Sequence, residues 1–121
     1  MDEDHLQDIF AGVAPVTVRR LFGGKGIYRD GLVFALEAFD RVWIKVDEET
    51  QPLFEAQGSQ PFTYQGKSRT VSLPYWSLPE AALEEPEEAA RWANLGIAAS
   101  RRKAAARPPA KPKKPKAKKA V

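Results

Sequence analysis

Glycine and lysine occur together at two places in this sequence, as they do in phosphate-binding loops. Three glycines surround Lys25 within residues 23–26, and residues 66–68 read Gly-Lys-Ser. A P-loop needs another glycine five residues before its Gly-Lys pair and a helix after it, so that backbone N–H groups point at the phosphate. Pro61 occupies that earlier position, and the β-forming pair Ile27-Tyr28 follows the first group. We therefore interpret both glycine groups as turns or bends between strands.

Few side chains of this sequence are suited to catalysis or to metal binding. The chain has one histidine and no cysteine, which excludes disulfides, thiolate chemistry and cysteine-ligated metal sites. His5 lies among acids near the N-terminus, and we interpret it as a surface residue. Glutamates 84, 85, 87 and 88 could serve acid–base chemistry only if burial raised one pKa, and their place at a helix start favours solvated side chains instead. We expect no catalytic residue, no metal and no cofactor.

Five aromatic residues could form a stacking platform for nucleic-acid bases or could pack in a core. A platform needs cations among its rings, whereas residues 1–100 are acidic overall, which opposes the approach of phosphate. We therefore favour core packing, and we expect Trp92 to anchor the last helix. The five residues are Trp43, Tyr64, Tyr75, Trp76 and Trp92.

Charge is distributed unevenly along the chain. Residues 101–121 hold ten of the 19 basic residues and no acid, so residues 1–100 hold nine basic residues, all 16 acids and a formal charge of −7. The segment consists of Ala, Lys, Pro, Arg and Val with one short arginine-rich start, a composition that cannot build a core. We expect a folded domain at 1–102 and a disordered basic tail at 103–121. The cations that we expect to meet nucleic acid are Arg101, Arg102, Lys103, Arg107, Lys111, Lys113, Lys114, Lys116, Lys118 and Lys119.

Local patterns predict helices at both ends of a set of hairpins. Apolar residues recur at helical spacing over 6–13, and Pro86 suits the first position of a last helix. Asp30-Gly31 predicts a two-residue hairpin turn, and residues 65–67 predict a second hairpin. Asp47 resembles the N-cap of a middle helix that ends at Gly58, and residues 74–79 read as a stiff link. The order α-β-β-β-α-β-β-α predicts a two-layer α+β domain with a mostly antiparallel sheet and its helices on one face.

Residues 13–100, about three quarters of the chain, resemble the N-terminal domain of the TfoX/Sxy family of bacterial competence regulators. The resemblance implies a two-layer α+β fold and a link to transcription, because the named regulators act as coactivators of competence genes beside a DNA-binding activator. Those regulators carry a second helical domain where this sequence has its basic segment. The resemblance supplies no catalytic residues. The motif residues that carry it are Phe22, Gly23, Gly24, Gly26, Tyr28, Asp30, Gly31, Lys45, Asp47, Gly58 and Trp92.

Together these features predict a non-enzymatic accessory protein whose body binds protein and whose basic segment binds nucleic acid without sequence preference. No apolar run reaches the roughly 20 residues of a membrane span, and no secretory signal opens the chain, so we expect a cytoplasmic protein without a membrane partner. Two alternatives stay open: a protein-interaction module, and a small-molecule-binding domain whose cleft is lined by aromatic residues and residues 23–26. The sequence leaves the oligomeric state open.

Overall fold

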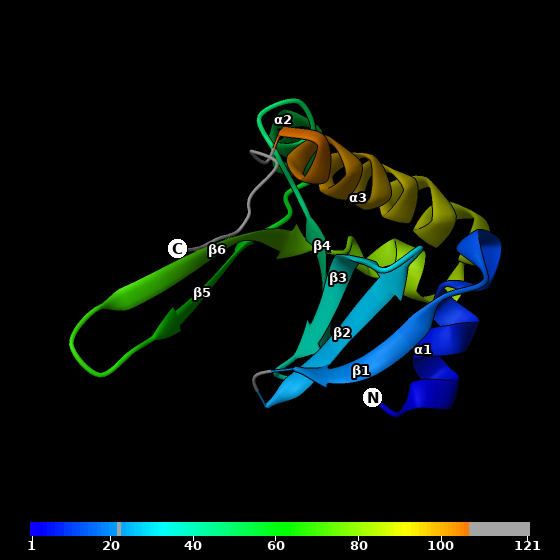
Figure 1. Ribbon diagram of the computed structural model, residues 1–121, viewed down its shortest axis with the longest axis horizontal. Coiled ribbons are helices and arrows are strands. Elements are labelled where there is room, and N and C mark those ends of the chain that lie inside the picture. Colours follow the sequence, from blue (N-terminus) through cyan, green and yellow to red (C-terminus); the bar gives the residue numbers. More distant parts are fainter. Residues whose placement is uncertain (22, 107–121) are drawn as a thin grey trace, which may run out of the picture.

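A six-stranded antiparallel sheet with the strand order β1-β2-β3-β4-β6-β5 forms one layer of the computed structural model, which describes residues 1–21 and 23–106. Four strands precede the middle helix, one more than in the predicted order. Half of β6 pairs only with β5, so this hairpin projects from the body as an arm (Figure 1). The strands are β1 Thr17–Leu21, β2 Gly24–Arg29, β3 Leu32–Ala38, β4 Arg41–Lys45, β5 Pro61–Gln65 and β6 Thr70–Ser77.

The helices form the second layer and cover one face of the sheet, as predicted. The long helix α3, Pro86–Ala106, packs on β3 and β4, and α1, Glu3–Ile9, lies beside it. The short helix α2, Gln51–Ala56, contacts β6 (Figure 1). Two 3₁₀ turns, η1 Ala11–Val13 and η2 Glu80–Glu84, complete the layer. None of the helices in residues 1–21 and 23–106 combines the length and the apolar character that crossing a membrane requires.

The hairpin signal at Asp30-Gly31 is confirmed by the backbone. Asp30 and Gly31 have φ angles of 54° and 80°, and both lie in the left-handed region that a two-residue hairpin turn requires. The N-terminal helix is shorter than predicted, because α1 ends at Ile9 and the chain tightens into η1. The last helix begins at Pro86, as predicted, and its regular structure continues to Ala106. Residues 103–106, which we assigned to the tail, are therefore helical.

The predicted cap at Asp47 and the predicted link at residues 74–79 are both wrong. The middle helix begins at Gln51, and the Asp47 carboxylate instead accepts N–H bonds from Glu49 and Thr50, at 3.1 Å each, in the preceding turn. Residues 74–77 belong to β6. Proline is tolerated in this strand because Pro74 lies just beyond the end of β4, where its carbonyl accepts a hydrogen bond from Val46.

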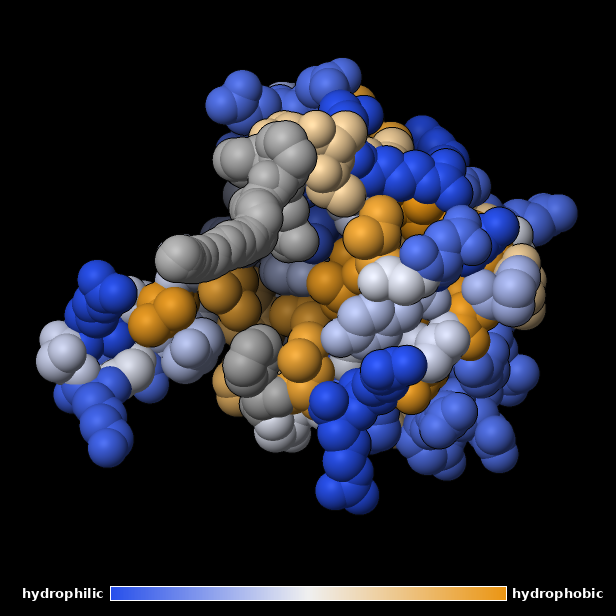
Figure 2. All heavy atoms as spheres, viewed as in Figure 1, coloured by the Kyte–Doolittle hydropathy of each residue, from blue (hydrophilic) through white to orange (hydrophobic). Residues whose placement is uncertain are grey.

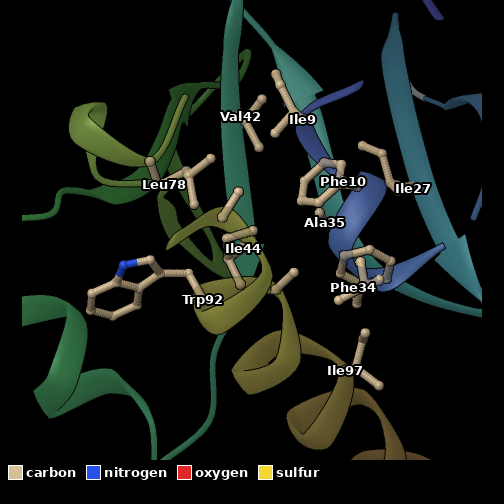
Figure 3. Packing of buried hydrophobic residues seen from close by; sticks show 14 of the residues in the cluster. Ile9, Phe10, Ile27, Phe34, Ala35, Val42, Ile44, Leu78, Trp92 and Ile97 are labelled. Atoms are coloured by element: carbon tan, nitrogen blue, oxygen red, sulfur yellow. The ribbon is translucent and has the colours of Figure 1, made fainter. Parts of the chain in front are cut away.

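The main hydrophobic core lies between the sheet and the helices (Figure 3). Phe34 and Ile44 point from β3 and β4 toward α3, and Phe10 meets the Phe34 ring edge-on at 5.4 Å. Trp92 is 5% exposed, and its ring packs 4.7 Å from the Phe54 ring of α2. The prediction that Trp92 anchors the last helix in the core is therefore confirmed.

The closest approach of α3 to the sheet occurs at Gly96. A Cβ atom at this position would lie 2.7 Å from Ile44 Cγ2 and 2.8 Å from the Phe34 carbonyl oxygen. Both distances are far below van der Waals contact, so only glycine lets the helix lie at this depth. The helix therefore accepts a residue of poor helix propensity in exchange for closer packing.

We predict that Gly96→Ala lowers the free energy of unfolding by about 1–3 kcal/mol, the usual effect of overpacking a core. The sign of this change in stability is informative, because Gly→Ala in an unconstrained helix raises stability by up to about 1 kcal/mol. Urea unfolding measures the change. Asn94→Ala, at an exposed position of the same helix, serves as the control and should leave stability unchanged or slightly raised. A more stable Gly96→Ala variant would contradict the close packing.

Candidate functional site

The two layers of the domain carry opposite charge. The sheet layer, residues 17–45 and 61–77, holds eight of the nine basic residues of the body and three of its acids, Asp30, Glu37 and Asp40. The remaining parts of residues 1–100, which we call the helical layer, hold 13 acids and one basic residue, Arg91. The net charge of −7 is thus not uniform, and the argument that an acidic body repels phosphate applies to the helical layer only.

The face of the sheet opposite the helices, called the open face below, carries cations beside aromatic rings. Side chains alternate between the faces of a strand, and those of the open face include Tyr28, Trp43 and Tyr75. Arg19 lies 5.8 Å from the Tyr28 ring centroid, Arg41 lies 4.9 Å from that of Trp43, and Lys45 lies 5.6 Å from that of Tyr75. Such cation–π contacts hold each cation against the sheet surface.

Within the described strands, the one acid, Glu37, lies on the helical side. Glu37 is buried, its carboxylate is 3.5 Å from Lys25 Nζ, and it is 3.8 Å from the Met1 ammonium group. The described strands therefore place no carboxylate on the open face. Burial, together with the neighbouring Tyr28 phenol, raises the pKa of Tyr75 to about 12. This phenol remains neutral at physiological pH and can donate a hydrogen bond.

A second, smaller hydrophobic cluster lies on the open face, and two of its buried residues, Leu36 and Phe62, line a cleft there. Leu36, Trp43, Phe62 and Tyr75 are buried there, away from the main core. The cleft has a volume of about 350 Å³ and lies between the arm and the β1–β2 and β3–β4 turns. Figure 2 shows hydrophobic residues gathered where the arm joins the body and hydrophilic side chains at the tip of the arm.

Two exposed aromatic rings stand at the rim of this cleft. Phe39 is 69% exposed and Tyr64 is 41% exposed. Their ring centroids lie 5.9 Å and 6.0 Å from that of Phe62. Gly23 and Gly24 line the same cleft. The small-molecule alternative expected residues 23–26 to line such a cleft.

The turn that presents Phe39 is strained. Phe39 and Asp40 have φ angles of 56° and 58°, in the left-handed region that favours glycine. The left-handed conformation costs a non-glycine residue about 1–2 kcal/mol. Sequence reasoning missed this turn. The only local signal is that Phe-Asp occupies a two-residue turn, where Asn-Gly is usual.

The aromatic residues considered as a platform fall into two groups. Trp92 lies in the main core, and Trp76 packs against that core. Trp43 and Tyr75 are buried on the open face, and Tyr64 is exposed at the cleft rim. Core packing is therefore confirmed for Trp43, Tyr75, Trp76 and Trp92. It is wrong for Tyr64, which is exposed on the face where cations lie beside aromatic rings.

Two of the predicted nucleic-acid-binding cations are paired with acids of the body. Arg101 lies 3.3 Å from Asp30, and Arg102 binds Asp47 through two hydrogen bonds of 2.6 and 3.1 Å. Arg102 Nε also lies 3.0 Å from Glu49. The hydrogen bond from Arg102 lowers the pKa of Asp47, against the opposing effect of burial. Lys103 is exposed in the last turns of α3. The cations that lie outside the described residues are Arg107, Lys111, Lys113, Lys114, Lys116, Lys118 and Lys119.

The motif residues of the family resemblance have separate roles and do not meet at one site. Gly23, Gly31 and Gly58 adopt positive φ angles in turns. Gly24 allows a close strand crossing, since a Cβ there would lie 2.2 Å from the Glu37 carbonyl oxygen. Gly26, Tyr28 and Lys45 lie in strands, Trp92 lies in the core, Asp30 and Asp47 receive the two arginines, and Phe22 lies outside the described residues.

Groups associated with metal binding or catalysis are dispersed. His5 is exposed on α1. Within residues 1–21 and 23–106, no three histidine, cysteine, aspartate or glutamate residues are grouped so that they could hold a metal ion. The arrangement of the open face is suited to binding a ligand through stacking and charge.

The family model described as the TfoX N-terminal domain matches residues 8–100. No curated protein matches the chain.

We predict that Arg102→Gln lowers the melting temperature and that the loss depends on pH. Because pairing lowers the pKa of Asp47, the pair stabilises the folded state fully above pH 3.8, the ordinary pKa of that carboxyl group, and its contribution is lost as pH falls through the lowered value. Thermal unfolding of both proteins from pH 7 down to pH 2.5 measures the difference. Arg101→Gln removes a more exposed pair and is the control, with little effect expected. A pH-independent difference would contradict the assignment.

Proposed function

The chain belongs to the TfoX N-terminal domain family, and from this membership we propose that it is a non-enzymatic accessory protein in transcription, serving competence genes as the family's named regulators do. Its basic C-terminal segment holds nucleic acid by charge and without sequence preference. The acidic helical layer binds a protein partner, such as a DNA-binding activator.

The observation that carries this proposal is the separation of charge along the chain. Ten cations and no acid fall within residues 101–121. Arg101 and Arg102 tie the start of the segment to Asp30 and Asp47 of the body. Eight basic residues of the segment are not part of these two pairs, and a run of that charge binds a polyanion through the release of condensed counterions.

The side chains on the open face support a binding role. Cations lie over neutral aromatic rings. The Tyr75 phenol is neutral at physiological pH, as tyrosine ordinarily is, and burial moves its pKa further from that range, to about 12. General acid–base catalysis is served best by a group whose pKa lies near the working pH. Stacking and charge pairing need no such group.

We predict that the full chain binds duplex DNA with a salt dependence set by the segment. If about half of the eight basic residues engage phosphates, log affinity should fall with log salt with a slope of about −3 to −4. A full-length variant in which Arg107 and the six lysines after it are glutamine should lose most of this affinity. Salt titrations by fluorescence anisotropy, on two duplexes of unrelated sequence, measure both effects.

The matched control is Arg91→Gln, which removes the one basic residue of the helical layer and should leave the slope unchanged. Equal duplex affinities for the wild type and the neutralised variant would refute a binding role for the segment. A strong preference for one duplex would indicate that the folded body, and not the basic segment, recognises the DNA.

A further inference from the structure

We propose that the cleft on the open face is a site for single-stranded nucleic acid, in which bases stack on Phe39 and Tyr64 and phosphates pair with the basic residues around them. The proposal rests on the proposed function for the class of partner, but it assigns a second site to the folded body. The C-terminal segment recognises charge alone, whereas this cleft recognises exposed bases.

The exposed rings support stacking. The described residues expose three large hydrophobic side chains, Phe39, Leu53 and Tyr64, and two of them stand at this cleft. Both rings contact Phe62, with centroid distances of 5.9 Å and 6.0 Å. Stacking on such rings tolerates every base, because each base has a π-face.

The backbone of the β3–β4 turn supports a binding role for Phe39. A glycine at this position would relieve the left-handed strain, and removing the ring would also remove an exposed hydrophobic surface. The ring contact that the fold gains from Phe39 is the one with Phe62. Strained residues of this kind cluster at ligand-binding sites.

The exposed charges on the open face and on the arm select an anionic partner. Arg19 and Arg41 are exposed on the open face, and Lys67 and Arg69 are exposed at the tip of the arm. Glu37 lines the cleft, but it is buried and its carboxylate lies 3.5 Å from Lys25 Nζ. Asp40, in the β3–β4 turn, faces the Met1 ammonium group at 3.1 Å. A purely apolar peptide would use the rings and leave these four cations without a role, whereas a phosphate backbone uses both.

The shape of the cleft favours a single strand over a duplex. Its volume of about 350 Å³ and its floor of Leu36, Phe62 and Leu73 suit a flat, apolar ring system. A single strand can splay its bases into such a hollow, whereas the bases of a duplex are stacked on one another. The acidic helical layer behind the sheet limits the surface over which a rigid duplex could be wrapped.

The test is a fluorescence-anisotropy titration of a labelled single strand with the full chain. The strand has about 12 nucleotides, within the usual range of site lengths for single-strand-binding proteins. Phe39→Gly and Tyr64→Ala should each weaken binding about tenfold. Phe39→Gly suits the positive φ, so its melting temperature should stay near that of the wild type and weaker binding would not reflect unfolding. Leu53→Ala, at the third exposed hydrophobic position, is the control and should bind as the wild type does.

Charge variants separate this site from the basic segment. The full-length chain with Arg107 and its six following lysines changed to glutamine should still bind the single strand, and Phe39→Gly in that background should remove the remaining binding. Arg41→Gln should reduce the salt slope by about one, and Arg91→Gln should not change it.

Three results would overturn the proposal: equal single-strand affinities for the wild type and both aromatic variants, no single-strand binding by the neutralised chain, or equal effects of Leu53→Ala and Tyr64→Ala. The first would leave the cleft to an apolar peptide or a small molecule. The role of the basic segment is judged separately, by whether neutralisation removes duplex binding.

Discussion

The contact between α3 and the sheet at Gly96 is the constraint on which the rest of the structure depends. Without a Cβ atom, the helix lies against Ile44 and the Phe34 carbonyl, which brings Trp92 into the core beside Phe54. The same rigid helix carries Arg101 and Arg102 to Asp30 and Asp47. One close contact therefore sets both the packing of the core and the place where the basic segment leaves the domain.

Covering only one face of the sheet leaves the other face with chemistry of its own. The open face holds a second hydrophobic cluster, cations over rings and no strand carboxylate, while 13 acids lie in the helical layer. An antiparallel sheet with one uncovered face usually turns polar side chains to solvent there. Here the uncovered face presents Phe39 and Tyr64 instead, at the rim of a cleft that the projecting arm helps to form (Figure 2). The division of charge between the layers gives the two faces different partners in this account.

Sequence reasoning succeeded where the cause of a structure is local. Asp30-Gly31 requires a turn, and Pro86 and Trp92 specify the start and the buried side of the last helix. It failed where contacts between distant residues determine the structure. Asp47 resembled a helix cap, but its carboxylate pairs with Arg102, 55 positions away along the chain. Pro74 resembled part of a link because the sequence does not show that it lies opposite the end of β4. The open-face cleft joins residues of β1, β2, β3, β5 and β6. The small-molecule alternative placed residues 23–26 at a cleft, but no local pattern could reveal which strands enclose it. The net charge of residues 1–100 also misled, because a sum cannot show that acids and cations occupy different layers.

The central claim is that the open face of the sheet, and not the helical layer, is the nucleic-acid-binding surface of the folded domain. Amide and side-chain chemical-shift mapping by NMR on the labelled full chain, titrated with a single-stranded oligonucleotide, tests it most directly. We expect shifts at Tyr64, Phe39 and Arg41 and at the tip of the arm, together with the basic segment, while α1 and α2 stay unchanged. Shifts confined to residues beyond Ser100, or centred on the helices, would contradict it.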